Sequence, residues 1–93
     1  MEADRKQNAE VIVYTLSYCP YCSAVKDLLR RKGIIFKEID FGEDDVLRAK
    51  IAELSGQQTA PQVFVNNNVI GGFKDVQKLE ASGELDKIIF GTS

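Results

Sequence analysis

The chain has 93 residues, enough for one domain with one hydrophobic core but not for two. Its 12 basic and 14 acidic residues are interleaved and give a net charge of −2, so the basic patch typical of a nucleic-acid-binding protein is absent. No apolar run approaches the roughly 18 residues that indicate a membrane span. We therefore expect a globular protein with neither nucleic-acid nor membrane partners.

The first nine residues are polar and mixed in charge, and they lack the apolar core of a signal peptide. We expect a flexible tail over residues 1–9, a single domain over residues 10–93 and a cytoplasmic location. Two cysteines without any histidine fall short of a disulfide-rich scaffold and of the four ligands of a structural zinc site. No metal is therefore expected, and the close spacing of the two cysteines indicates redox chemistry.

β-branched and apolar residues predict a buried strand over residues 11–16. Helical spacing follows, with Val25, Leu28 and Leu29 on one face, and Gly33 predicts the end of that helix. The basic run at residues 30–32 suits a helix C-terminus, where cations offset the helix dipole.

Residues 35–40 predict a second strand, and the acidic residues 43–45 suit the first turn of a second helix. That helix is expected to end at Ser55-Gly56 and to direct four side chains inward: Val46, Leu47, Ile51 and Leu54. Residues 62–65 and 69–71 predict two further strands, joined by a tight turn over Asn66 to Asn68. A helical pattern resumes after Gly72 and breaks near Ser82-Gly83.

The predicted order is β-α-β-α-β-β-α, which defines an α/β fold. The first two strands should pair in parallel through a right-handed crossover, and the hairpin should add two antiparallel strands. One four-stranded mixed sheet with helices on both faces follows. The pattern alone does not determine the order of the strands in the sheet.

Cys19 and Cys22 stand directly after a predicted strand and open a predicted helix. Free N–H groups and the positive end of the helix dipole favour the thiolate form of Cys19 and lower its pKa. The thiolate is the form that attacks disulfides. Cys22 lies one turn further on the same face and should be the less exposed, resolving thiol. Pro20 suits the first turn because it has no N–H to leave unsatisfied.

Three motifs share this chain in order: Thr15 to Cys22 (TLSYCPYC), Thr59-Ala60-Pro61, and Gly71 to Asp75 (GGFKD). Together they resemble a dithiol glutaredoxin, which carries Cys-Pro-Tyr-Cys, and the resemblance spans residues 11–90. It implies the thioredoxin fold with sheet order 2-1-3-4. It also implies a glutathione-dependent oxidoreductase that reduces protein disulfides and glutathione mixed disulfides.

The resemblance assigns Cys19 as the nucleophile and Cys22 as the resolving thiol. Pro61 matches the family's cis-proline, which would aim the backbone of Ala60 at the cysteine of glutathione. The other implied glutathione-binding residues are Tyr21 beside the sulfur, Gln57 at the glycine carboxylate, Thr59, and Gly71, Gly72, Lys74 and Asp75 toward the γ-glutamyl end. Several of these also suit roles without a ligand: an exposed aromatic for Tyr21, a plain turn for the glycines, and charge at a helix start for Asp75.

The chain departs from the family pattern at three positions. Leu16 stands where many glutaredoxins have a lysine that helps stabilise the thiolate, so we expect a less depressed pKa at Cys19 and weaker glutathione binding. Ala60 replaces the usual valine, which matters little because the backbone makes the contact. Lys74 stands where many relatives have aspartate. Either it contacts the γ-glutamyl carboxylate or it is a solvated lysine at the start of a helix.

Three alternatives remain open. The first is a glutaredoxin-like electron donor to ribonucleotide reductase, recharged by thioredoxin reductase, which Leu16 favours and the glutathione-site motifs oppose. The second is a carrier of a [2Fe–2S] cluster, although such glutaredoxins usually carry Cys-Gly-Phe-Ser; a brown colour after anaerobic purification would indicate it. The third, a pure binding module, has no need of two cysteines at a helix start. We expect a monomer that uses glutathione as co-substrate and acts on disulfide-bearing or glutathionylated proteins.

Overall fold

The computed structural model of the chain describes residues 7–57 and 59–91. Its elements are β1 (Val11–Thr15), α1 (Pro20–Arg31), β2 (Lys37–Asp40), α2 (Asp45–Ser55), β3 (Gln62–Val65), β4 (Asn68–Gly71), α3 (Phe73–Ser82) and α4 (Glu84–Phe90). The predicted order is confirmed, as is the break in the last helix. Gly83 takes a left-handed φ of 84° there, a conformation that ends α3 and is easiest for glycine.

The four strands form one sheet in the order β2-β1-β3-β4. β1 is parallel to β2 and antiparallel to β3, which in turn is antiparallel to β4. Asn66 and Asn67 turn the β3–β4 hairpin with φ values of 51° and 68°, as the asparagine run predicted. The expected mixed sheet and its strand order are therefore confirmed.

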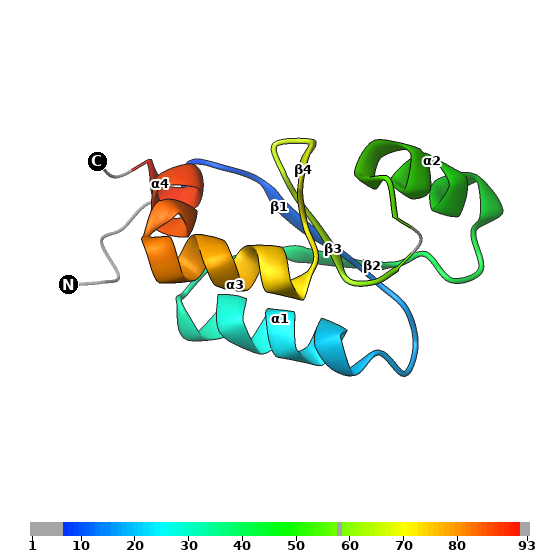
Figure 1. The fold of residues 1–93 in the computed structure, drawn as a ribbon, viewed down its shortest axis with the longest axis horizontal. Coiled ribbons are helices and arrows are strands. Elements are labelled where there is room, and N and C mark those ends of the chain that lie inside the picture. Colours follow the sequence, from blue (N-terminus) through cyan, green and yellow to red (C-terminus); the bar gives the residue numbers. More distant parts are fainter. Residues whose placement is uncertain (1–6, 58, 92–93) are drawn as a thin grey trace.

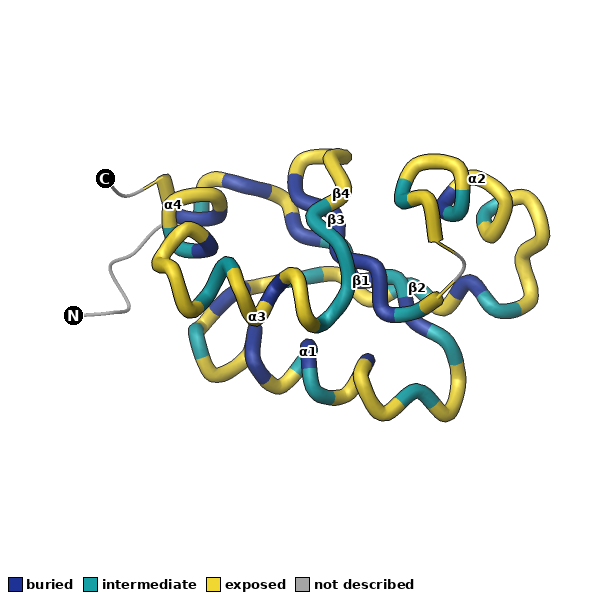
Figure 2. The backbone as a smooth tube through the Cα atoms, in the orientation of Figure 1, coloured by how far each residue is buried: buried dark blue, intermediate teal, exposed yellow. Residues whose placement is uncertain are grey.

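The main core lies on the face of the sheet that α1 and α3 cover (Figures 1 and 2). Because side chains alternate along a strand, Val11 and Val13 of β1 point to this face together. The predicted stripe of α1 packs against them, since Val25, Leu28 and Leu29 are all buried. The core also includes Ile34, Val63, Val65, Val76, Leu85, Ile89 and Phe90.

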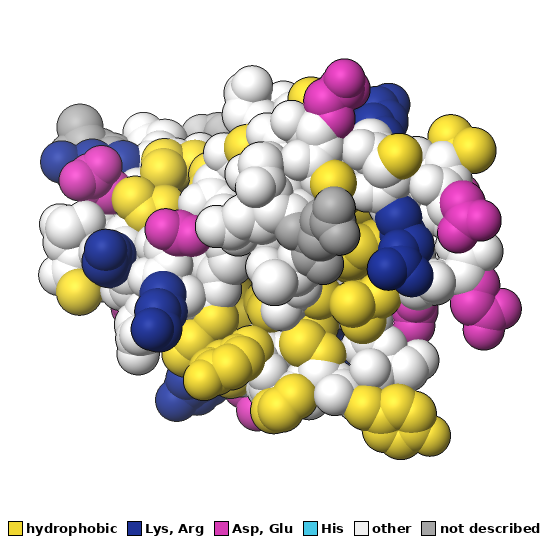
Figure 3. Space-filling view, turned by 45° about the vertical axis from the view of Figure 1, so that its right-hand side comes forward, with side chains coloured by type: hydrophobic (Ala, Val, Ile, Leu, Met, Phe, Trp, Pro, Cys, Tyr) yellow, Lys and Arg dark blue, Asp and Glu magenta, His cyan; other side chains and the backbone are white. Residues whose placement is uncertain are grey.

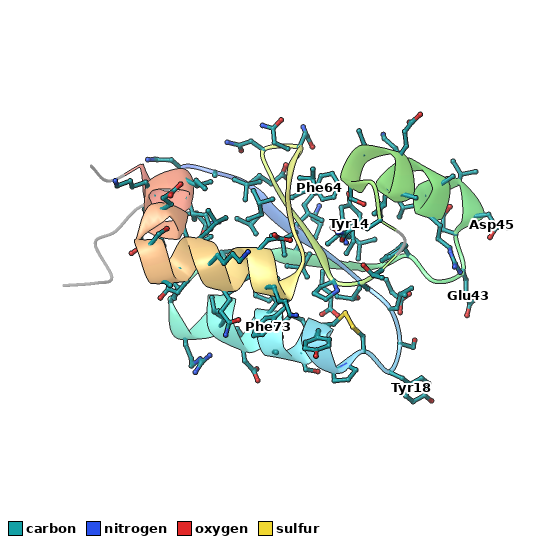
Figure 4. The ribbon with its side chains drawn as sticks, viewed as in Figure 1. Tyr14, Tyr18, Glu43, Asp45, Phe64 and Phe73 are labelled. Atoms are coloured by element: carbon teal, nitrogen blue, oxygen red, sulfur yellow. A yellow bond between two sulfur atoms is a disulfide. The ribbon has the colours of Figure 1, made fainter. Side chains whose placement is uncertain are left out.

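An aromatic cluster fills the opposite face, beneath α2. Tyr14 of β1 meets the rings of Phe41 and Phe64 edge to face, with centroids 6.4 and 5.1 Å away, and Figure 4 shows Tyr14 and Phe64 directed toward α2. Ile51 is the buried residue of α2. The prediction that α2 also buries Val46 and Leu54 was wrong, because these side chains are 80% and 50% exposed.

The difference at α2 has a simple geometric reason. The helix covers one end of the sheet and so buries a narrow stripe rather than a broad face (Figure 1). Val46 lies roughly 100° around the helix axis from Leu47 and therefore faces solvent. An amphipathic pattern in sequence marks apolar positions, but it does not state how wide the covering surface is.

Two ion-paired lysines connect α1 to its neighbours. Lys26 bonds Glu38 of β2 at 2.9 Å, and this hydrogen bond holds the pKa of Glu38 below its ordinary value. Lys32, the C-cap of α1, lies 2.8 Å from both Glu80 of α3 and Asp86 of α4. Burial lowers the pKa of Lys32, but its hydrogen bonds to Asp86 and Glu80 outweigh burial and raise the pKa overall. Lys32, the last residue of the basic run, therefore ends α1 and also links it to α3 and α4.

Part of the predicted N-terminal tail belongs to the folded domain. Ala9 is buried, the Asn8 N–H donates to the carbonyl of Ile89 at 2.9 Å, and the Gln7 side chain bonds both backbone groups of Ile35. The remainder of the predicted tail, residues 1–6, lies outside the described residues. The domain thus begins no later than Gln7, because these three residues close one end of the core.

The helices in the described ranges are all too short or too polar to cross a lipid bilayer.

Candidate active site

Cys19 is the N-cap of α1, and Pro20 occupies the first helical turn as predicted. The N–H of Cys22 donates to the Cys19 sulfur at 3.2 Å, as the free N–H groups at a helix start predict. The sulfur therefore lies at the positive end of the helix dipole, where a negative charge is stabilised.

The two cysteine sulfurs are joined as a disulfide, with Cα atoms 5.2 Å apart. Cys22 is 3% exposed, whereas Cys19 is partly exposed at the surface. The predicted division of accessibility is confirmed: an external disulfide can reach Cys19 and cannot reach Cys22.

A second chain segment meets the Cys19 sulfur from the loop before β3. The Ala60–Pro61 peptide bond is cis, as predicted, and the carbonyl oxygen of Ala60 lies 3.5 Å from the Cys19 sulfur. Pro61 is buried, and its own carbonyl faces Gly72, where an added Cβ would lie 3.2 Å from the oxygen. The backbones of residues 60–61 and 71–72 therefore lie side by side next to the disulfide.

Gly71, Gly72 and Asp75 form a compact unit at the start of α3. The carboxylate of Asp75 accepts a hydrogen bond from the Gly72 N–H at 3.1 Å and so caps the helix. Gly71 has a φ of 115°, and a Cβ added there would collide with the Asp75 carboxylate. Glycine is thus required at position 71 by both backbone conformation and space.

Aromatic side chains flank the disulfide. Tyr21 is 57% exposed and stacks on Phe73, with ring centroids 5.9 Å apart and planes inclined by 29°. Tyr18 is fully exposed, has a left-handed φ of 60°, and points away from the protein beside the disulfide (Figure 4). In the face of Figure 3, hydrophobic side chains gather in the lower part, whereas acidic side chains lie at the right-hand edge, at the top and on the left.

The remaining predicted residues, Gln57, Thr59 and Lys74, are all exposed. Gln57 and Thr59 are exposed in the loop before Ala60, and their side chains contact one another at 3.5 Å. Lys74 is exposed at the start of α3 and makes no hydrogen bond or ion pair with the part of the chain that is described. The structure thus brings Cys19, Ala60, Pro61 and the glycine pair together, and among the described residues Lys74 has no polar contact with them.

Two residues that support this region, Phe73 and Gln62, were not predicted from the sequence. Phe73 supports Tyr21, and Gln62 is a fully buried polar residue that binds the loop bearing Gln57 and Thr59. A signal for Gln62 was present, since a glutamine opens an otherwise apolar strand. No comparable signal marked Phe73, because an aromatic residue at a helix start is equally consistent with the core.

Leu16 borders an open groove between the active-site loop and the β2–α2 loop. Its lining includes the acidic residues Asp40, Glu43 and Asp44 and one basic residue, Arg48. The guanidinium of Arg48 donates to the carbonyl of Gly42 at 3.0 Å. Leucine at position 16 therefore leaves this side of the site with more acidic than basic groups.

A partly exposed cysteine and a buried one, linked at a strand-to-helix junction beside a cis-proline loop, define a thiol–disulfide oxidoreductase of the thioredoxin fold. The family model described as "Glutaredoxin" matches residues 11–70. A "Glutaredoxin" of Pseudomonas aeruginosa is 40% identical over 79 residues, which cover 85% of this chain and 94% of that protein.

Solved structures agree with this match. The glutaredoxin of Brucella melitensis, solved in solution, is 44% identical with a TM-score of 0.78, covering 90% of this chain and 92% of the other. The crystal structure of a buckwheat glutaredoxin–glutathione complex is 30% identical with a TM-score of 0.81, covering 87% and 76%. The chain belongs to the glutaredoxin family.

Proposed function

We propose that the chain is a glutathione-dependent oxidoreductase of the cytoplasm that reduces protein disulfides and glutathione mixed disulfides. One observation carries the proposal: the partly exposed Cys19 sulfur lies at a helix N-terminus, 3.5 Å from the Ala60 backbone. A peptide-like ligand attached to Cys19 can therefore bond that backbone while its sulfur stays at the site. The similar buckwheat protein was crystallised with glutathione, which supports this ligand.

In the proposed reaction, the Cys19 thiolate attacks one sulfur of a substrate disulfide and releases the other as a thiolate. The resulting mixed disulfide has two fates. With a protein substrate, Cys22 attacks the Cys19 sulfur, frees the reduced protein and leaves the Cys19–Cys22 disulfide, which two glutathione molecules reduce. With a glutathionylated protein, Cys19 takes the glutathionyl group, and a second glutathione releases it as glutathione disulfide.

Glutathione would lie on the surface beside Cys19, between the start of α1, the loop before β3 and the start of α3. Tyr21 would cover its sulfur, the backbone of Ala60 would bond its cysteine, and Gly71-Gly72 would let its γ-glutamyl end approach. Asp75 would hold the α-amino group while still capping α3, since its carboxylate has further acceptor sites. Gln57 would bond the glycine carboxylate.

A coupled assay with glutathione, glutathione reductase and NADPH on a small mixed disulfide tests the proposal. We expect robust turnover by the wild-type protein. No turnover with glutathione, combined with reduction of the disulfide by thioredoxin reductase, would instead support the ribonucleotide-reductase donor. Leu16 favours this second function, because a leucine at position 16 supplies no positive charge to the glutathione site.

The Leu16→Lys variant tests how the absence of a positive charge at position 16 affects the Cys19 pKa and the binding of glutathione. We expect it to lower the pKa of the Cys19 thiol in the reduced protein. We also expect a roughly two- to fivefold lower KM for glutathione, the size of an exposed ion pair. Thiolate absorbance during a pH titration and the coupled assay measure the two effects. An unchanged pKa would refute a role for position 16 in setting the charge of Cys19.

Lys74→Glu tests whether Lys74 contacts the γ-glutamyl carboxylate. If it does, reversing its charge should raise the KM for glutathione roughly two- to fivefold. Lys78→Glu is the matched control, because Lys78 is an exposed lysine one turn further along α3. Equal KM values for both variants would mean that Lys74 is only a solvated residue at the helix start.

A further inference from the structure

Gln62 is a polar side chain with no exposed surface in the strand QVFV. Its Nε2 donates to the carbonyl of Thr59 at 3.0 Å and to Oε1 of Gln57 at 3.1 Å, and it lies 3.5 Å from the Thr59 hydroxyl. A single buried amide therefore ties β3 to the loop that leads into Ala60 and Pro61.

The acceptors in this loop dictate which way the Gln62 amide faces. The Thr59 carbonyl belongs to the backbone and can only accept, so Gln62 must direct its NH₂ group toward it. Oε1 of Gln62 is then left without a hydrogen-bond partner among the described residues. A buried acceptor without a partner is unfavourable, so the bonds to the loop determine this orientation.

The orientation of Gln62 in turn fixes that of Gln57. Because Gln62 donates from its NH₂ group, the acceptor on Gln57 must be its carbonyl oxygen Oε1. The Thr59 hydroxyl also lies 3.5 Å from this oxygen. The Nε2 group of Gln57 then has no acceptor among residues 7–57 and 59–91, so both of its hydrogens can serve a ligand, and the residue is exposed. An exposed glutamine without this contact would present either its NH₂ or its carbonyl group.

We propose that Gln62 is a positioning residue that holds the Gln57 amide with its donor side toward the glycine carboxylate of glutathione. The inference rests on the proposed function. Gln62 is too deeply buried to touch the ligand and acts only through Gln57, while the Thr59 carbonyl fixes the orientation of the Gln62 amide itself.

The Gln62→Met variant tests the inference, since methionine has a similar length and shape but no donor. We expect the KM for glutathione to rise roughly three- to tenfold, the equivalent of one hydrogen bond, with kcat little changed. Reduction of the Cys19–Cys22 disulfide by dithiothreitol, which has no carboxylate, should proceed at the wild-type rate. Should the methionine variant fail to fold, Gln62→Asn keeps the amide but is too short to reach Gln57.

A double-mutant cycle with Gln57→Ala separates positioning from general support of the fold. If Gln62 acts through Gln57, its replacement should not raise the KM further in the Gln57→Ala background. Independent, multiplying effects would overturn the inference, as would an unchanged KM or an equal loss of rate with dithiothreitol. Absence of glutathione turnover in the wild-type protein would be a distinct result, because it would overturn the proposed function and the inference with it.

Discussion

Serine at position 19 should abolish the reduction of both protein disulfides and glutathione mixed disulfides. Cys19 is the partly exposed cysteine at the start of α1, and Cys22, at 3% exposure, cannot take over as nucleophile. Loss of the attacking group should lower both rates on the order of a thousandfold or more. The coupled glutathione assay and a protein-disulfide assay measure these rates side by side.

Serine at position 22 provides the contrasting result. Deglutathionylation needs only Cys19, so it should continue, whereas reduction of a protein disulfide should stop at the mixed disulfide that Cys22 normally resolves. Loss of both activities in Cys22→Ser would mean that the second thiol takes part in every turnover. Substantial activity in Cys19→Ser would contradict the assignment of the nucleophile altogether.

Leu29→Ala should produce the largest loss of stability among the substitutions considered. Leu29 has no exposed surface and lies within the core between α1 and the sheet. Truncating a buried leucine removes its burial energy and leaves a cavity, so the free energy of unfolding should fall by roughly 2–5 kcal/mol. That is a large fraction of the roughly 5–15 kcal/mol that stabilises a typical domain. Denaturant unfolding of the oxidised protein measures the change.

Leu54→Ala is the matched control, because the same truncation is made on a side chain that is 50% exposed at the end of α2. We expect a loss well below that of Leu29→Ala, close to the ±0.5 kcal/mol typical of surface positions. A cost at Leu54 equal to that at Leu29 would contradict the structure. It would indicate that α2 buries the broader face that its sequence pattern predicts.

Sequence patterns predicted the elements well where local chemistry determines them. The apolar alternation of β1, the stripe of α1, the asparagine turn and the break at Gly83 all appear where expected. The order of the strands followed only from the resemblance of three motifs to a family, because the pairing of distant segments leaves no periodic trace. The exposed side chains of Val46 and Leu54 show that the apolar pattern of α2 did not predict how much of the helix is covered.

In the candidate site, too, some residues were predicted from local sequence patterns and others were not. The spacing of Cys19 and Cys22 and the cis-proline motif predicted the arrangement around the sulfur, since each is tied to a local backbone requirement. Gln62 was not predicted, because its role depends on contacts with the loop that carries Gln57 and Thr59. Neither composition nor periodicity reveals how that loop folds back onto β3. Residues 7–9 were likewise placed in a tail because their partners, Ile35 and Ile89, lie far along the chain.

The most direct test of the account is the intact mass of the reduced Cys22→Ser protein after incubation with glutathione disulfide. We expect one glutathionyl group on Cys19, which excess glutathione then removes, because the exposed thiolate attacks the disulfide and the variant has no second thiol to resolve it. The Cys19→Ser protein, in which only the buried Cys22 remains, should stay unmodified. An unmodified Cys22→Ser protein, or an adduct on Cys22 in the other variant, would contradict the proposal that Cys19 exchanges glutathione.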